Sequence, residues 1–225
     1  MSKKTTLIAL SVSIVILSII IIANFTTDSI GGSASKENYT EKVSSLHYFN
    51  QPVQTDTTGE TTVRISSTNV KLTYVAKYSI SGRAVVVKHY RGGTRNDLAP
   101  VDVALAWDIL ADKKVDEKIE WGTPQSRFYS YYVTDGQWLN SIGGLDKIAH
   151  NSANCHLIPA DNNIKKLIKS IEEGDYVKIE GYLVNVYWET ITGGYYYMNT
   201  STTRTDTGAG ACEIIYVTGI KWLEL

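Results

Sequence analysis

Residues 161–188 read DNNIKKLIKSIEEGDYVKIEGYLVNVYW, and this stretch decides the fold of the chain. Its first part predicts an α-helix over residues 161–173, because apolar side chains recur at positions i, i+3, i+4 and i+7 while lysines take the opposite side. Asp161 is the expected N-cap and Gly174 the expected stop. Its second part, residues 176–188, is rich in β-branched and aromatic residues and predicts a long strand that bends at Gly181.

Glycine-rich turns follow this strand on its C-terminal side. Residues 192–194 lead into a second predicted strand, 195–204, and residues 206–210 lead into a third, 211–218. Three consecutive antiparallel strands with a helix before them favour a curved antiparallel sheet or an OB-like barrel. The predicted fold class is therefore α+β with β dominant, with one or two helices.

Strands also dominate the chain before residue 151. Residues 71–80 and 83–90 are separated by a Ser-Gly pair and predict a hairpin or one strand with a bulge, and residues 128–133 predict a further strand. Pro100 suits the first position of a helix. A short helix is predicted from there, because apolar residues follow at helical spacing: Val103, Trp107 and Leu110.

A long apolar segment lies near the N-terminus. After Lys3 and Lys4 the chain is uncharged from residue 5 to residue 27, and residues 7–23 are almost wholly apolar. At a rise of ~1.5 Å per residue, about 20 residues cross a bilayer core of ~30 Å, so residues 7–27 are predicted to form a retained transmembrane anchor. A cleaved signal peptide is the alternative, but the run is long and has no small-x-small exit.

The flanking charges orient the predicted anchor. Lys3 and Lys4 precede it, while acidic residues balance or exceed basic ones after it, so the positive-inside rule places the N-terminus in the cytoplasm and the domain outside. The stretch after the anchor is rich in Gly, Ser and Thr, which is typical of linkers. We therefore expect a single-pass cell-membrane protein with a cytoplasmic stub (1–6), an anchor (7–27), a flexible linker (28–60) and an extracytoplasmic β-rich domain (61–225).

The charge balance makes a nucleic-acid partner a poor expectation. The chain has 22 Lys and Arg against 23 Asp and Glu, a formal net charge of −1, and no basic stretch gathers in the predicted domain. Its aromatic residues are 15 Tyr and 5 Trp against 3 Phe. Tyr and Trp combine a large apolar body with a polar tip, which suits binding surfaces. A glycan, peptide or protein ligand fits this composition better.

Four segments stand in a characteristic order along the chain: LAPVDVALAW at 98–107, NSANCHLIPA at 151–160, GDYVKIEGYLV at 174–184 and DTGAGACE at 206–213. Together they resemble an uncharacterised family of small bacterial proteins that often carry a signal or anchor. The resemblance covers roughly residues 75–218, and it departs from the family pattern at Asp108 and Cys155. It implies a single domain and brings no activity, cofactor or catalytic residue.

The two cysteines, Cys155 and Cys212, both lie in the predicted outside domain. Thiols oxidise readily in such compartments, and a disulfide between these two closes a loop long enough to stabilise the fold by about 4 kcal/mol. Two unpaired buried cysteines, acting as small apolar residues, are the alternative.

His156 is the candidate general acid–base group, with Glu213 or Asp102 as its partner in a hydrolase. A cysteine thiolate activated by a neighbouring histidine is a further reading of the same region. Cys155 and His156 are adjacent and point to opposite faces of a strand, and no CxxC or HExxH spacing occurs. Neither a metal nor a cofactor is therefore predicted.

Three aromatic residues and one arginine in the last quarter of the chain predict a stacking platform for a ligand. Its members are Tyr195, Tyr197, Trp188 and Arg204. The leading hypothesis is a membrane-anchored extracytoplasmic binding or interaction domain that is not an enzyme. The alternatives are a membrane-tethered hydrolase that uses His156, and an OB-like nucleic-acid binder.

Overall fold

The computed structural model describes residues 35–45, 49–123, 127–190, 192–206, 208 and 210–224. They belong to one compact unit, residues 34–225. The predicted cytoplasmic stub and anchor, residues 1–27, lie outside the described residues. Within the described ranges, no helix is long and apolar enough to cross a membrane.

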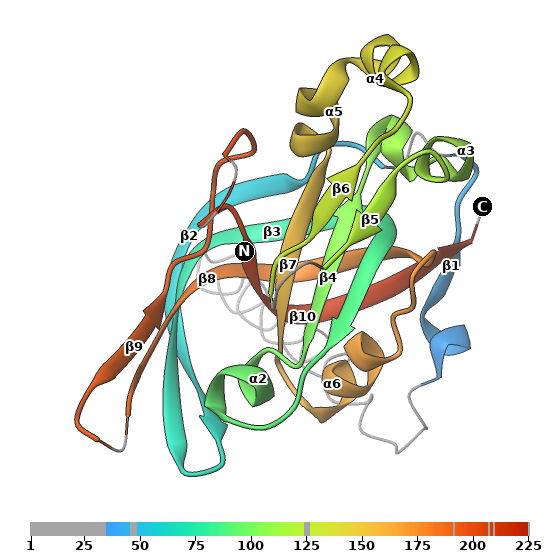
Figure 1. The fold of residues 1–225 in the computed structure, drawn as a ribbon. Helices are drawn as coiled ribbons and strands as arrows, with labels where there is room; N and C mark the ends of the chain where they lie inside the picture. The colour runs from blue at the N-terminus through green and yellow to red at the C-terminus, as the bar shows by residue number, and fades with distance from the viewer. Residues whose placement is uncertain are drawn as a thin grey trace, which may run out of the picture. The chain divides into compact units, whose positions relative to one another are not determined.

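Strands are the predominant secondary structure of the domain, so the predicted β-dominant α+β class is confirmed (Figure 1). In chain order the elements are η1 (Lys36–Tyr39), β1 (Thr40–Lys42), β2 (Val53–Ile65), β3 (Thr68–His89), α2 (Thr94–Leu98), β4 (Val101–Ala106), η3 (Asp108–Ala111), α3 (Lys113–Asp116), β5 (Glu120–Gly122), β6 (Ser130–Tyr132), α4 (Gly136–Ile142), α5 (Gly144–His150), β7 (Ser152–Pro159), α6 (Asn162–Lys169), β8 (Tyr176–Glu189), β9 (Tyr195–Met198) and β10 (Glu213–Glu224).

The main sheet closes on itself. Its strands follow the order β1-β10-β7-β4-β3-β8-β9, and β10 also pairs with β8, so β3, β4, β7, β10 and β8 form a closed five-strand circuit. Most pairs are antiparallel, but β10 runs parallel to both β7 and β1. The sheet is therefore mixed, and the prediction of a purely antiparallel sheet is wrong in this respect.

The interior of this circuit holds the largest hydrophobic cluster. Alternate residues of β4 and β7 point inward, among them Val103 and Cys155, and they meet apolar residues of β3, β8 and β10. Helix α6 packs against one end of the circuit through Ile164, Leu167 and Ile168. Helices α4 and α5 lie toward the opposite end (Figure 1).

Helix α6 confirms the predicted amphipathic helix. The Asp161 side chain accepts a hydrogen bond from the Ile164 backbone N–H at 2.8 Å, as an N-cap does. The helix ends at Lys169, earlier than predicted, and Gly174 adopts a positive φ of 93° in the turn that follows.

Strand β8 confirms the predicted long strand and explains its central glycine. A Cβ atom on Gly181 would lie 2.0 Å from the backbone oxygen of Tyr216 in β10. The register of β10 against β8 shifts just beyond this point, between Val217 and Gly219. Glycine is therefore required where the two strands that close the circuit approach each other most closely.

Strand β3 settles the alternative between a hairpin and a bulged strand. It is one continuous strand of 22 residues, with register shifts between Tyr74 and Ala76 and between Ala84 and Val86. The bulged-strand alternative is confirmed. The predicted strand at 128–133 is present but shorter, as β6.

The short helix predicted after Pro100 is wrong, because Val101–Ala106 forms strand β4. All six of its residues are buried, since one face points into the circuit and the other is covered by a loop. A strand covered on both faces has no polar alternation, so its apolar residues also match helical spacing.

The described part of the predicted linker contains two strands. Residues 40–42 form β1 on the edge of β10, and residues 53–60 belong to β2, which pairs with β3. Strand β2 is mostly exposed and rich in threonine, so its composition resembles a linker although its backbone is paired. The domain therefore begins before residue 61.

Candidate functional site

The outward faces of β4 and β7 carry a buried polar cluster. Asp102 and His156 are register partners in the antiparallel β4–β7 pair, and Asn154 lies two residues before His156. Strand alternation turns these three side chains away from the circuit interior. All three are buried, because the segment around Arg127 covers this face of the sheet.

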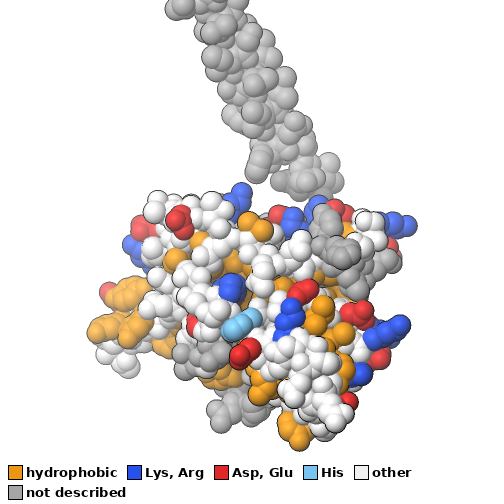
Figure 2. Space-filling model, turned by 90° about the horizontal axis from the view of Figure 1, so that it is seen from above, with side chains coloured by type: hydrophobic (Ala, Val, Ile, Leu, Met, Phe, Trp, Pro, Cys, Tyr) orange, Lys and Arg blue, Asp and Glu red, His pale blue; other side chains and the backbone are white. Residues whose placement is uncertain are grey.

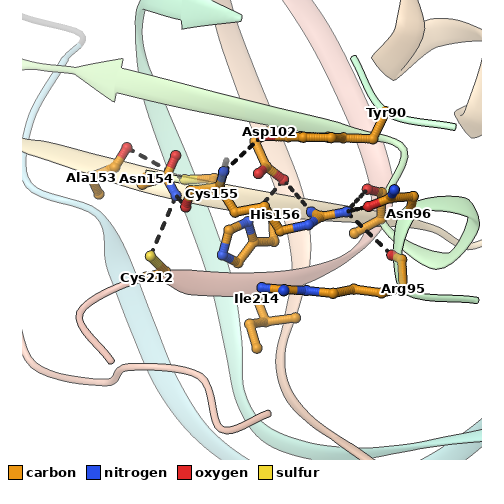
Figure 3. Close-up of polar contacts among 12 residues, drawn as sticks. Tyr90, Arg95, Asn96, Asp102, Ala153, Asn154, Cys155, His156, Cys212 and Ile214 are labelled. Carbon is orange, nitrogen blue, oxygen red and sulfur yellow. Dashed lines mark hydrogen bonds and ion pairs between the residues drawn. The ribbon is translucent and has the colours of Figure 1, made fainter. Parts of the chain in front are cut away.

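Asp102 lies between two cationic groups. Its Oδ1 atom accepts a hydrogen bond from Nη1 of Arg127 at 2.8 Å and lies 2.8 Å from Nδ1 of His156 (Figure 3). The second contact has an ion-pair distance, although the Nδ1–H direction is poorly aligned for a hydrogen bond. Burial opposes a charge on His156, but Asp102 and Cys212 outweigh it and raise the pKa of His156 to about 9.

A cage of acceptors fixes Arg127. Besides Asp102, its guanidinium donates to the Asn96 side chain at 2.9 Å and to the Ala99 carbonyl at 3.0 Å, and it stacks on the ring of Tyr90 at 4.2 Å. Burial lowers the pKa of Arg127, although Asp102 works in the other direction. These acceptors fix the Arg127 guanidinium in the position from which it pairs with Asp102.

Cys212 lies on the other side of the His156 ring, which Figure 3 shows between Cys212 and Asp102. The nearby thiol contributes to the raised pKa of His156. The Nδ2 group of Asn154 donates to Cys212 Sγ at 3.4 Å and to the Arg127 carbonyl at 3.0 Å. Asn154 thereby ties the sulfur to the loop that holds Asp102.

The two cysteines lie on opposite faces of the barrel wall. Cys155 points into the interior, where it is fully buried, while Cys212 is half-buried on the outside. Both are free thiols in the structure. A disulfide between them would need the two Cβ atoms, which lie on opposite faces, to come within about 4 Å of each other. The disulfide remains a prediction for oxidised protein.

A cavity of about 180 Å³ opens beside Cys212. Phe128, Tyr129 and Tyr131 form an aromatic wall, and the start of β7 and the loop before β10 form the rest. The polar side chains on its lining include Asn154, Arg204, Asp206, Cys212 and Glu213. The cavity therefore brings aromatic rings, a thiol and a buried ion pair into one space.

Arg204 and Glu213 form the buried ion pair of this cavity. Arg204 Nη1 contacts the Glu213 carboxylate and donates to Tyr78 OH at 3.1 Å. Arg204 Nη2 and Glu213 Oε2 are buried and find no hydrogen-bond partner among the described residues. Burial outweighs the attraction of Arg204 and raises the pKa of Glu213 to about 7. The pair therefore presents one spare donor and one spare acceptor.

The predicted hydrolase residues divide between two faces. His156 and Asp102 do lie together, as the sequence-based pairing supposed. Glu213 is the register partner of the inward-pointing Cys155, so it faces the interior and pairs with Arg204 instead of His156. Arg127 was not predicted, because it comes from a loop without any recognisable spacing.

The predicted aromatic platform is also divided. Tyr195 and Tyr197 are 69% and 65% exposed on β9, and Tyr187 of β8 lies opposite Tyr197 and stacks on Tyr195 at 6.3 Å. Trp188 is on the other face, buried and stacked on Tyr196 at 4.1 Å. Arg204 lies in the cavity. Strand alternation separates Trp188 from the tyrosines, so the platform consists of three tyrosines.

No group of three or more His, Cys, Asp or Glu side chains in the described ranges is arranged to hold a metal ion. Comparisons with known proteins gave no match to a family model, to a curated protein or to a solved structure. A function for this protein must therefore be inferred from the geometry of the site.

Proposed function

We propose that this chain is a membrane-anchored, extracytoplasmic binding protein whose barrel holds one end of a glycan in the cavity beside Cys212. The observation that carries the proposal is the Arg204–Glu213 pair, which lines the cavity and has one buried, unpaired atom on each side chain. A buried polar atom without a partner costs about 1–3 kcal/mol, so a ligand that satisfies both atoms gains affinity from them.

The topology supports an OB-like barrel as the framework. The five strands of the circuit occur along the chain as β3, β4, β7, β8 and β10; the third and fifth are parallel, and α6 lies between the third and fourth. OB folds bind oligosaccharides and oligonucleotides on the face of strands two and three and on the loops after strands one and four. The cavity uses the equivalent elements, β7 and the loop before β10.

A sugar ring matches the chemistry of the cavity. Its C–H face can stack on the wall formed by Phe128, Tyr129 and Tyr131, since aromatic rings provide a flat apolar surface. Each sugar hydroxyl both donates and accepts a hydrogen bond, so a pair of hydroxyls can satisfy Arg204 Nη2 and Glu213 Oε2 together.

Nucleic acid fits less well. Positive and negative side chains are interspersed over the face shown in Figure 2, and Arg204 in the cavity is neutralised by Glu213. A phosphate backbone is bound through several uncompensated cations. We therefore propose a neutral polyol ligand.

The first experiment is a saturation-transfer NMR screen of the full chain in detergent against a panel of neutral and N-acetylated monosaccharides. We expect at least one sugar to bind and Arg204→Lys to weaken binding by about 10-fold, because lysine keeps the charge but has no second nitrogen donor at the position of Nη2. Arg64→Lys is the matched control: Arg64 is exposed on β2, outside the cavity lining, and donates to the Ser66 carbonyl.

Two results would contradict the proposal. One is that no sugar of the panel transfers saturation although the protein is folded. The other is that Arg204→Lys and Arg64→Lys bind equally well. Preferential binding of a short single-stranded oligonucleotide, lost at high salt, would favour the nucleic-acid alternative instead.

A further inference from the structure

The strongest unassigned feature is the line of side chains Cys212, His156 and Asp102 at the edge of the cavity. We propose that Cys212 is a nucleophile that takes an acyl group from an ester or amide substrate, with His156 as its acid–base partner and Asp102 as the residue that positions His156. This inference needs the cavity to admit an acyl group, but it does not depend on the sugar ligand proposed above.

The geometry places each group for this role. Asp102 Oδ1 lies 2.8 Å from Nδ1 of His156, and Figure 3 shows Cys212 on the other side of the ring, which is the side of Nε2. Cys212 lines the cavity and is half-buried, whereas His156 and Asp102 behind it are buried. A nucleophile, its base and an orienting carboxylate in this order are the arrangement that acyl transfer requires.

Further hydrogen bonds fix the two ends of this arrangement, Asp102 and Cys212. Arg127 donates to the same Asp102 oxygen at 2.8 Å, and its own acceptors fix its position. Asn154 donates to Cys212 Sγ at 3.4 Å. An amide N–H at this position also lies beside an oxyanion formed on a carbon bonded to Sγ, where it can stabilise the charge.

The environment of the other cysteine, Cys155, is unsuited to a nucleophile. Cys155 is enclosed in the barrel interior, and burial raises the pKa of its thiol well above the usual range. Such a thiol is inert. Of the two cysteines, Cys212 lines the cavity and lies beside the His156 ring in Figure 3, whereas Cys155 lies in the interior.

The reaction proceeds in two balanced steps. His156 Nε2 holds the proton of the Cys212 thiol while Sγ attacks the carbonyl carbon; the C–O or C–N bond then breaks, and the leaving oxygen or nitrogen takes that proton from Nε2. The product on the protein is a thioester. Nε2 next removes a proton from water, the hydroxide attacks the thioester, and the C–S bond breaks to release the acid while the proton returns to the Cys212–His156 pair.

The experiment measures hydrolysis of p-nitrophenyl acetate by the full chain in detergent, with intact-protein mass spectrometry to detect acetyl-Cys212. We expect release of p-nitrophenol with an initial burst, and a loss of about 100-fold or more in Cys212→Ser and His156→Gln, as for the loss of a general base or nucleophile. Cys155→Ala is the matched thiol control, and its rate should equal that of the unmodified chain.

The positioning role of Asp102 is tested by a property that would not change if Asp102 only stabilised the fold. The charged or titratable groups around the imidazole are Asp102 from β4 and Cys212 from the loop before β10, with Arg127 behind Asp102. Asp102→Asn removes the contact that raises the pKa of His156, so the pKa of His156, followed by NMR of its ring protons, should fall below that of the unmodified chain.

Several outcomes would overturn the proposal. Acetylation of Cys155 instead of Cys212, or equal rates in Cys212→Ser and the unmodified chain, would exclude Cys212 as the nucleophile. If His156→Gln does not fold, as judged by circular dichroism, Cys212→Ser decides alone, because serine differs by one atom and removes no buried charge. Sugar binding by an inactive but folded chain would overturn this inference and leave the binding function intact.

Discussion

At the scale of single residues, Glu213 is a carboxyl group whose charge costs stability. Its side chain is 2% exposed, and its pKa rises from 4.5 to about 7 in the folded protein. A folded pKa above the unfolded one means that protonation favours the folded state. The stabilising contribution is thus complete below pH ~4.5 and is lost as pH rises through about 7.

We predict that Glu213→Gln removes the loss of stability that accompanies ionisation of Glu213 as the pH rises. The free energy of unfolding of the unmodified chain should fall by about 3 kcal/mol more than that of the variant between pH 5 and pH 8. Urea unfolding at both pH values measures the difference, and the contribution of His156 cancels because both proteins retain it. The exposed Glu180→Gln serves as control and should follow the unmodified chain.

The same pH dependence in Glu213→Gln and the unmodified chain would contradict the prediction. In that case the Glu213 carboxyl is already ionised at pH 5, and Arg204 compensates for its burial more completely than the fold suggests.

Sequence patterns locate part of the candidate site but not its connections. Asp102 and His156 stand out because they are polar residues within apolar strands, and their pairing follows from the antiparallel register. Glu213 stands out for the same reason, yet its partner is Arg204, since strand alternation places it on the other face. Arg127 reaches Asp102 from a loop, and no periodicity reveals a contact of that kind.

At the scale of elements, the β8–β10 pair depends on one glycine. Gly181 lies where a side chain would meet the Tyr216 carbonyl at 2.0 Å, a distance that backbone atoms cannot relieve without separating the strands. We predict that Gly181→Ala destabilises the domain by about 3 kcal/mol, at the upper end of typical overpacking costs.

The control for this prediction is in the same sheet. A Cβ on Gly219 would meet its nearest neighbour, the Glu180 Cβ, at 3.8 Å, which is ordinary contact, so Gly219→Ala should change stability by less than about 1 kcal/mol. Thermal unfolding followed by circular dichroism compares the two variants. Equal melting temperatures would mean that β8 and β10 do not approach as closely as described.

The elements with a clear polar face were predictable. Helix α6 has one apolar side and one lysine-rich side, and its position was correctly placed from residue 161 onward. Strand β4 is buried on both faces and β2 on almost none, so neither shows the alternation that identifies a half-buried strand. The apolar spacing in β4 therefore led to the wrong prediction of a helix, and the composition of β2 led to the wrong prediction of a linker.

At the scale of the whole molecule, the closure of the sheet could be anticipated only in outline. An OB-like barrel was one of two predicted architectures, and the parallel pairing of β7 with β10 was not foreseen. That pair joins segments separated by α6, β8 and β9, so no local pattern specifies it. Burial of apolar residues of both strands in the same hydrophobic cluster favours the pairing instead.

The membrane anchor is a prediction for the complete chain. We expect the full-length protein to remain in the membrane fraction after alkaline carbonate extraction, because about 20 apolar residues insert stably into a bilayer. Deletion of residues 7–27 should release it into the soluble fraction. The cleaved-signal alternative predicts instead a mature protein whose mass lacks the apolar segment, which intact-mass measurement distinguishes.

The closing strand also sets an order for synthesis. Of the strands in the circuit, β10 comes last along the chain, and it pairs with β7 on one side and β8 on the other. Until residues 213–224 have left the ribosome, both of those strands have an open edge, and open edges invite pairing with other chains. The nascent protein therefore keeps these two edges unpaired until the 12 residues of β10 are available, and their pairing ends that exposure.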